Sequence, residues 1–292
     1  MLALQLLVDG VGKGAIYAAL ALAIVVAHRS TGLINFAQGE FATLSAMLTV
    51  ALTGLGLGVW PALAVAAAAS FAAGALIQVV IVRPAMRRDL VPVVIMIGLY
   101  VCANAIGQLT FGQNPRPLEG LFPAGGLVFG GIRVQWSLIG VILLQAVVIT
   151  ALTLFFVRTK IGLGFRAVAT APEASRVAGI PVERMHMIGW GIAAALGAVA
   201  GVSLTNLGVY VESHMMTTVL VYSLAAVTIG GFDSALGAIV GGAIMGVVES
   251  LVTGLVPGVS GDVGILVSLT IIVLILLSRP QGLFGRERVA RV

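Results

Sequence analysis

The amino-acid sequence predicts an all-α membrane protein, a polytopic bundle of roughly eight or nine transmembrane helices with broken or re-entrant segments. Hydrophobic residues make up 60% of the 292 residues and charged residues only 9%, whereas an ordinary soluble domain has about 25% charged residues. The apolar residues form long continuous runs without the alternation of a transmembrane barrel. Because backbone groups in hydrocarbon must hydrogen-bond within the segment, helices are the expected structure.

Apolar runs long enough to cross a bilayer core of about 30 Å recur along the chain. We predict spans at 6–27, 36–55, 61–82, 90–110, 136–157, 187–209, 216–230, 236–255 and 264–277. The seventh span is short enough to be a broken or re-entrant helix. Residues 1–292 are therefore interpreted as a single transmembrane domain, with one long loop at 158–184.

Basic residues gather after the first, third and fifth spans and in the C-terminal tail. They are Arg29; Arg83, Arg87 and Arg88; Arg158, Lys160, Arg166, Arg176 and Arg184; and Arg279, Arg286, Arg288 and Arg291. Positive charge marks cytoplasmic loops. Nine crossings would place all four groups inside, with an outside N-terminus and a cytoplasmic C-terminus; eight would leave a basic loop on the wrong side. The net charge of +5 thus indicates orientation and does not indicate nucleic-acid binding.

A polar segment that contains glycines lies where the second span begins. Asn35, Gln38 and Glu40 would be costly facing lipid, so we expect them to face the bundle interior or a water-filled pathway. Gly32 and Gly39 would permit an unwound stretch that presents backbone groups to a solute, as in many transporters. The alternative is a simple helix cap, with Asn35 as the N-cap and the acid in the first turn.

The loop 158–184 is too long for a simple hairpin. Within it, 164–180 predicts a short amphipathic helix or helix pair that ends at Gly179 and Pro181, with Pro172 and Glu173 suited to a first helical turn. Such a helix on the cytoplasmic face would dock a cytoplasmic protein. Alternatively, it would lie in the headgroups with its arginines toward anionic membrane lipid.

A second glycine-rich break, Gly230 and Gly231 followed by Phe232 and an acid, resembles the first polar segment and suggests an internal repeat. Glu249 lies in the middle of a span and should point inward, either for transport or as a buried hydrogen-bonding group. The loop 112–135 is interpreted as a solvated connector or as a contact for an outside partner. Three further polar membrane residues are interpreted as interhelical contacts: Asn104, Gln108 and Asn206.

Five stretches, in this order and spacing, resemble the permease subunits of branched-chain amino acid ABC transporters. They are 14–20, 32–40, 166–180, 230–232 and 279–285. The resemblance implies a bacterial inner-membrane subunit that works with a second, related permease, two cytoplasmic ATPase subunits and a periplasmic solute-binding protein. This chain would form the path for branched-chain or related amino acids. It has no P-loop, so ATP would be bound by the partners and no cofactor is expected here.

The same resemblance makes 158–184 the loop that couples the permease to its ATPases. Glu173 and Ala174, followed by Gly179, are similar to the Glu-Ala-Ala and downstream Gly pattern by which importer permeases contact their ATPases, and Arg166 lies in the same loop. The Ile-x-Leu-Pro end of that pattern is missing. Many family members also have His at the position of Gln38.

Two other classes of function compete with this interpretation. An ion-coupled secondary transporter would also use broken helices, with Glu249 as its main ionisable group, but it leaves the basic loop unexplained. An intramembrane enzyme would need a catalytic or metal-binding constellation, and the sequence contains neither a His-Glu-x-x-His pair nor a Gly-x-Ser-x-Gly elbow. No residue selects among leucine, isoleucine, valine, urea, amides and other amino acids.

Overall fold

The computed structural model describes residues 1–86, 91–256, 261–279 and 281–284. Along the chain it contains α1 (Leu2–Thr31), α2 (Gln38–Gly54), α3 (Val59–Ile77), a π-helical turn η1 (Gln78–Val82), α4 (Arg83–Ala85), α5 (Val91–Phe111), β1 (Gly126–Phe129), β2 (Ile132–Gln135), α6 (Trp136–Arg158), α7 (Lys160–Thr170), α8 (Pro172–Val177), α9 (Val182–Thr205), α10 (Thr217–Gly230), α11 (Ala235–Leu255) and α12 (Gly261–Ser278). Several predicted features lie outside the described residues: Arg87, Arg88, Pro280, Gly285, Arg286, Arg288 and Arg291.

The chain is a multi-pass helical protein, and each predicted span corresponds to a helix. Among the described residues, six helices are long and apolar enough to cross a membrane: α1, α3 with its extension to Ala85, α5, α6, α9 and α11. Two further apolar helices, α10 and α12, are shorter. The prediction that 216–230 forms a short helix is confirmed, because α10 has 14 residues.

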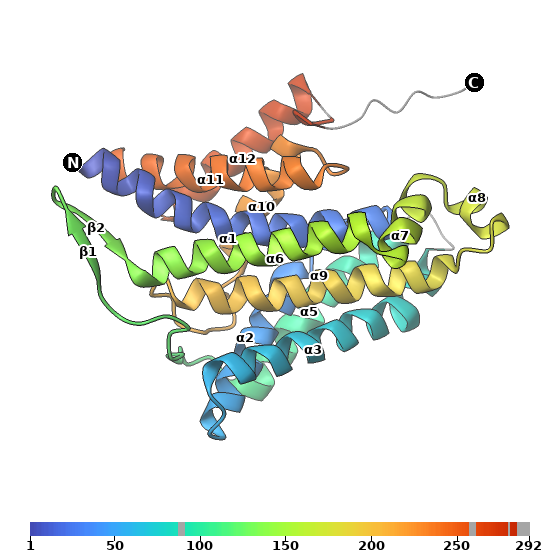
Figure 1. Cartoon of the computed structure of the whole chain (residues 1–292), viewed down its shortest axis with the longest axis horizontal. Coiled ribbons are helices and arrows are strands. Elements are labelled where there is room, and N and C mark those ends of the chain that lie inside the picture. Colours follow the sequence, from blue (N-terminus) through green and yellow to red (C-terminus); the bar gives the residue numbers. More distant parts are fainter. Residues whose placement is uncertain (87–90, 257–260, 280, 285–292) are drawn as a thin grey trace.

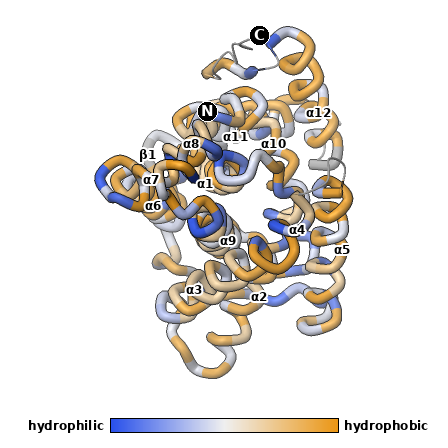
Figure 2. Tube along the Cα trace, turned by 90° about the vertical axis from the view of Figure 1, so that its right-hand side faces the viewer, coloured by the Kyte–Doolittle hydropathy of each residue, from blue (hydrophilic) through white to orange (hydrophobic). Residues whose placement is uncertain are grey.

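Two helices lie at the centre of the bundle. Figure 2 looks along the helices from the end at which α7 and α8 lie, and it shows α1 and α9 inside, with α3, α5, α6 and α12 around them. Of the most apolar stretch of α1, 83% is buried, against 17% for that of α5. The outer helices therefore leave wide apolar surfaces for lipid or for another subunit.

Close backbone contact joins α1 to α11, which run side by side (Figure 1). A Cβ on Gly10 would lie 2.8 Å from Cα of Val247, and a Cβ on Gly246 would overlap the backbone of Gly14. Small residues four apart allow this approach, and in lipid the resulting dispersion contacts stabilise helix pairs. Close bundle packing is therefore what the glycine-rich run 237–246 provides.

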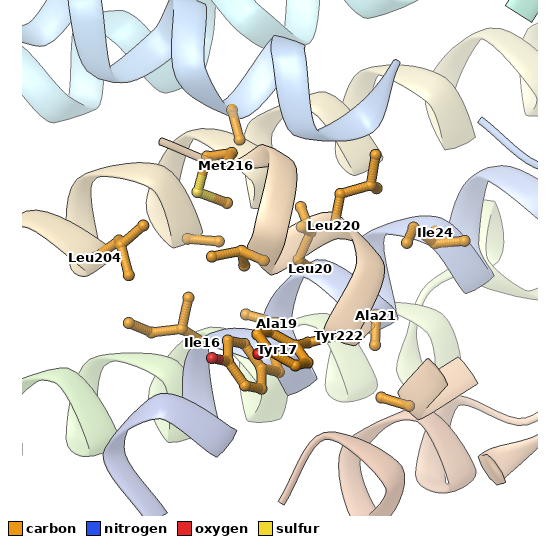
Figure 3. Close-up of a cluster of buried hydrophobic side chains, with 14 of the residues drawn as sticks. Ile16, Tyr17, Ala19, Leu20, Ala21, Ile24, Leu204, Met216, Leu220 and Tyr222 are labelled. Carbon is orange, nitrogen blue, oxygen red and sulfur yellow. The ribbon is translucent and has the colours of Figure 1, made fainter. Parts of the chain in front are cut away.

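The main hydrophobic cluster fills the space where α1, α9 and α10 meet. Figure 3 shows Ile16, Leu20 and Ile24 of α1 facing Met216 and Leu220 at the start of α10. Below them, the rings of Tyr17 and Tyr222 stack with centroids 5.1 Å apart. This apolar contact fixes the short helix α10 against the central helix α1.

The two short helices α2 and α10 begin beside each other. A Cβ on Gly39, in the first turn of α2, would lie 3.2 Å from the carbonyl oxygen of Met216, which precedes α10. Gln38 contacts Ala193, halfway along α9. Both helices therefore start at about mid-depth in the bundle. The non-helical stretch 32–37 leads the chain from α1 back to this level.

The basic residues in the last turn of α1, in α4 and in the long loop lie at one end of the bundle. Glu183 at the start of α9 lies 3.9 Å from Arg83 and 3.4 Å from Arg176 of α8. At the same end, His28 of α1 lies 4.0 Å from Asp233, in the turn between α10 and α11. This clustering agrees with the predicted spans, because two successive crossings return the chain to the side from which it started.

The opposite end carries a feature that the all-α prediction did not include. Strands β1 and β2 form an antiparallel hairpin within the loop 112–135. Gln5 of α1 holds the hairpin, because its amide nitrogen donates to the Arg133 carbonyl (3.0 Å) and its amide oxygen accepts from the Arg133 backbone nitrogen (2.8 Å). The loop is thus tied to the bundle, and its apolar and glycine-rich composition alone did not indicate strand pairing.

We predict that Gly246→Leu destabilises the protein by about 1–3 kcal/mol or more, because the new side chain overlaps α1. The measurement is the thermal midpoint of the purified protein in detergent, followed by size-exclusion chromatography. Gly98→Leu is the matched control, since nothing lies within 4 Å of a Cβ at that position. Equal midpoints for the two variants would contradict the proposed packing role of Gly246.

Candidate functional site

Asn35 and Gln38 form a buried hydrogen-bonded chain that fastens the start of α2 to α9. The Asn35 amide nitrogen donates to the Gln38 side-chain oxygen (3.1 Å), and the Gln38 amide nitrogen donates to the Ala193 carbonyl (2.7 Å). The Asn35 side-chain oxygen accepts from the backbone nitrogen of Ala37 (3.0 Å), and Ala37 is the N-cap of α2. Asn35 therefore caps the turn before the helix and lies two residues ahead of the N-cap, Ala37, whereas the sequence predicted Asn35 itself as the N-cap.

Glu40 lies in the first turn of α2 and is 2% exposed. Its Oε2 accepts a hydrogen bond from the Asn104 amide nitrogen of α5 (3.2 Å), and the same nitrogen donates to the Ser213 carbonyl (3.1 Å). Gln108 in turn donates to the Asn104 side-chain oxygen (2.6 Å). The interpretation of Asn104 as an interhelical contact is confirmed. Its partner is Glu40, which the sequence analysis predicted to face the bundle interior or a pathway.

Glu249 of α11 is paired with a cation. The Lys13 ammonium of α1 lies 2.9 Å from both carboxylate oxygens. Glu249 is 8% exposed and Lys13 is 37% exposed. The inward direction expected for Glu249 is therefore found, together with a partner that sequence reasoning missed. Lys13 sits near the beginning of an apolar run, which gives no signal of the element that it contacts.

The four glycines expected at helix breaks differ in their surroundings. Gly32 ends α1 with a φ of 76°, and Gly231 ends α10 with a φ of 98°. Both conformations favour glycine because a Cβ would be strained there. Gly39 instead lies inside the first turn of α2 and packs against α10, and Gly230 is the last residue of α10 and packs against Gly237. These two glycines serve close contact between helices.

The C-terminal tail caps the end of α10. The backbone nitrogens of Leu283 and Phe284 donate to the carbonyls of Ile229 (2.7 Å) and Gly230 (3.1 Å). The last carbonyls of a helix have no partner within the helix, so the tail satisfies groups that the break leaves open. Sequence reasoning grouped the tail with the family pattern but had no signal for this long-range contact.

The loop 158–184 contains the predicted helix pair, α7 and α8. Pro172 is the first residue of α8, Gly179 has a φ of 78°, and Pro181 precedes α9. Phe165 of α7 is buried and packs against Phe156 of α6. On α8, by contrast, Glu173 is 90% exposed and Val177 is 92% exposed. Figure 1 shows α8 projecting at the far end of the bundle. The other two residues singled out in this loop, Arg166 and Ala174, are also exposed.

The end of the bundle that carries the β-hairpin has an open depression of about 970 Å³. Glu119, Arg133, Gln135 and Asn206 are among its lining residues. Asn206 holds the loop, because its side-chain oxygen accepts from the Leu121 backbone nitrogen (2.7 Å). The depression therefore lies at the end opposite α8, on a loop that hydrogen bonds fix to the bundle, and its lining includes an acidic and a basic residue.

Comparisons with known proteins agree along the whole chain. Residues 6–276 match the family model described as branched-chain amino acid transport system / permease component. The permease protein BraD of the high-affinity branched-chain amino acid transport system of Pseudomonas aeruginosa is 28% identical, with 99% of this chain and 98% of that protein covered. The LivH permease protein of Salmonella typhimurium is 29% identical, with 99% and 97% covered.

A solved structure shares the fold at low sequence identity. The structure of PsaBC from Streptococcus pneumoniae in complex with Fab superposes with a TM-score of 0.51 at 12% identity, covering 94% of this chain and 91% of that chain.

We predict that Lys13→Met lowers stability by about 2 kcal/mol, because it leaves the buried Glu249 carboxylate without its cation. The loss should be below that of a fully buried pair, since Lys13 is partly exposed. The double variant Lys13→Met/Glu249→Leu should recover most of the loss in a thermal-midpoint measurement. Independent, additive losses for the two single substitutions would show that the ion pair does not link α1 to α11.

Proposed function

Because this chain belongs to the family of permease components of branched-chain amino acid transport systems, we propose that it is the membrane-spanning permease of an ATP-binding-cassette importer. It would form the translocation path for branched-chain or related amino acids across the inner membrane. The observation that carries this proposal is the exposed helix α8 at the basic end of an otherwise apolar bundle. Such a helix offers a cytoplasmic ATPase a contact that lies outside the membrane.

Two features of α8 support a docking role. Glu173 and Val177 are almost fully exposed, whereas Ser175 between them is buried and anchors the helix. An exposed apolar side chain beside charged groups suits the centre of a protein contact. Arg176 pairs with Glu183 of α9 (3.4 Å), and this ion pair links α8 to the start of α9. We assign ATPase contact to Glu173, Ala174 and Gly179, with Arg166 nearby on α7.

The packing supplies a route from α8 to the interior. Movement of α8 would be passed to α9, which follows it directly after Pro181. Ala193 of α9 accepts the hydrogen bond from Gln38, so a tilt of α9 would displace the start of α2. ATP binding and hydrolysis in the partner subunits would in this way alternate the path between inward-open and outward-open states.

We place the N-terminus outside and the C-terminus in the cytoplasm, with nine crossings. The positive-inside rule supports this orientation, because Arg29, Arg83 and the long basic loop lie at the end that carries α8. The helices α2 and α10 begin at mid-depth, and the non-helical segments before them, 32–37 and 206–216, would complete their crossings. The substrate pathway would pass these helix starts, where Asn35, Gln38 and Glu40 lie.

The expected partners follow from the two ends of the bundle. Two cytoplasmic ATPase subunits would contact α8 of this chain and of a second, related permease. A periplasmic solute-binding protein would meet the outer depression, whose tied loop offers Glu119 and Arg133. The apolar outer faces of α5 and α6 would contact membrane lipid or the second permease.

An ion-coupled secondary transporter is the second candidate function. Its main coupling group would be Glu249, but Lys13 holds both oxygens of that carboxylate at 2.9 Å. A coupling carboxylate must bind and release an ion, and the Lys13 ammonium competes with that ion for both carboxylate oxygens. The geometry therefore favours the ATP-driven importer.

Uptake of labelled leucine into proteoliposomes tests the proposed function. The vesicles would hold this chain with its candidate second permease, ATPases and binding protein, with and without internal ATP. ATP-dependent leucine uptake is the expected result. Uptake that ignores ATP and follows a proton or sodium gradient would establish the secondary transporter instead. ATPase stimulation by a binding protein loaded with another solute would keep the mechanism and change the substrate.

We predict that Glu173→Arg weakens ATPase association about tenfold, equivalent to roughly 1.4 kcal/mol, and lowers uptake in parallel. The change reverses a charge on the exposed face of α8 and places it beside Arg176. Co-purification of the ATPase subunits from detergent measures the association. Glu119→Arg, the same change at the opposite end, is the control for association. An unchanged yield of ATPase with Glu173→Arg would remove α8 from the coupling contact.

A further inference from the structure

We propose that the Glu40 carboxylate binds the ammonium group of the transported amino acid. The assignment rests on the proposed function and names one recognition group within the pathway. It implies substrates with a free α-amino group and disfavours uncharged solutes such as urea and simple amides. Four observations support it: the charge state of the neighbourhood, the cost of burial, the position of Glu40 in the bundle and a track of amide groups that leads to it.

The first observation is a difference between two buried acids. Glu249 is neutralised by Lys13 at 2.9 Å. Glu40 is the more buried of the two, and within residues 1–86, 91–256, 261–279 and 281–284 it forms no ion pair with Lys, Arg or His. His214, on the segment before α10, is close enough to interact with it electrostatically. Within the part of the chain that the structure describes, Glu249 has a cationic partner at contact distance and Glu40 has none.

The second observation concerns free energy. Burying a carboxylate costs several kcal/mol even after the protein relaxes. The first turn of α2 offsets at most about 2 kcal/mol through the helix dipole, and the neutral Asn104 amide adds about one hydrogen bond. These contributions fall short of what a cation at contact distance supplies. A cationic ligand group would complete the site.

The third observation is position. Glu40 lies where α2 begins, beside the start of α10, at about half the depth of α9. Solute sites of transporters lie at this depth, next to discontinuous helices. Glu249 lies instead between α1 and α11, whose backbones are in direct contact through Gly10, Gly14 and Gly246. That position is a helix contact held by Lys13, and it is not the start of a discontinuous helix.

The fourth observation is a line of side-chain amides along α5. Gln113, at the exposed outer end, donates to Gln108 (3.0 Å), Gln108 donates to Asn104 (2.6 Å), and Asn104 donates to Glu40 (3.2 Å). Neutral side-chain amides can hydrogen-bond both to the ammonium and to the carboxylate of an amino acid. They bind either group less tightly than an opposite charge would. Figure 2 shows α5 at the edge of the bundle beside α2, and its small buried fraction allows it to move relative to α2.

In this assignment, Asn104 occupies the ammonium position while no substrate is bound. Its amide nitrogen donates to Glu40 at 3.2 Å, which is long for a hydrogen bond to an ionised carboxylate. An ammonium group is a stronger donor to a carboxylate than a neutral amide. The arriving substrate would therefore displace Asn104 and separate α5 from α2.

The test compares ATP-dependent leucine uptake by proteoliposomes of the complete complex with Glu40→Gln in this chain. Glutamine keeps the size of the side chain and its ability to accept from Asn104, and it removes the charge. Uptake should fall at least about tenfold, because one partner of a buried charge pair is lost. ATPase stimulation by the leucine-loaded binding protein should persist. Asp9→Asn is the control, since asparagine can still accept the hydrogen bond from Gln5.

Two variants that retain a carboxylate separate charge from structure. Glu40→Asp withdraws the carboxylate by one methylene, and Glu40→Gln/Asn104→Asp moves it across the existing hydrogen bond. Partial recovery of uptake in either variant supports the assignment. Full uptake by Glu40→Gln overturns it, and so does a loss in Glu40→Gln that neither carboxylate variant relieves. If the unmodified complex shows neither ATP-dependent leucine uptake nor ATPase stimulation by any loaded binding protein, the proposed function itself is overturned, and this assignment with it.

Discussion

The backbone contact between α1 and α11 is the constraint on which the rest of the structure depends. In lipid, apolar side chains gain nothing by leaving the solvent, so helices associate through dispersion and polar contacts. Glycines at positions 10, 14, 242 and 246 remove the side chains that would hold the two helices apart. The same closeness brings Lys13 to Glu249 and gives α10 a fixed surface, because Gly230 packs on Gly237 and Gly241 packs on Ala226.

Against that rigid pair, the polar entry to α2 is stabilised by specific partners. Asn35 and Gln38 satisfy each other and the Ala193 carbonyl, so they cost little to bury. Glu40 has one neutral donor and the helix dipole. The segment therefore combines a cap, which was one of the two interpretations of its sequence, with a carboxyl group that has no cation at contact distance among the described residues. These roles belong to different residues of the same turn.

The two ends of the bundle have different shapes, and each shape suits the partner that we propose for it. At the basic end, α8 is exposed and α7 is anchored by Phe165, so the surface is a small projecting helix. At the outer end, the hairpin and the loop before it are fastened by Gln5 and Asn206 around an open depression. A projecting helix suits a subunit that moves the permease, and a tied concave surface suits a protein that delivers a solute.

Composition and local pattern by themselves determined the membrane class, a helix for each span, the short α10, the basic end and the α7 and α8 pair. These features depend on run length, charge and turn residues, which are local in the chain. Only the tertiary structure decided that Lys13 neutralises Glu249, that Asn104 contacts Glu40, that Gly39 serves packing, and that the outer loop forms a hairpin. The helix contacts among these pair elements far apart in the chain, such as Lys13 and Glu249, and one apolar helix carries no local signal for which neighbour it will contact. The hairpin is local, but the composition of its loop gave no signal for strand pairing.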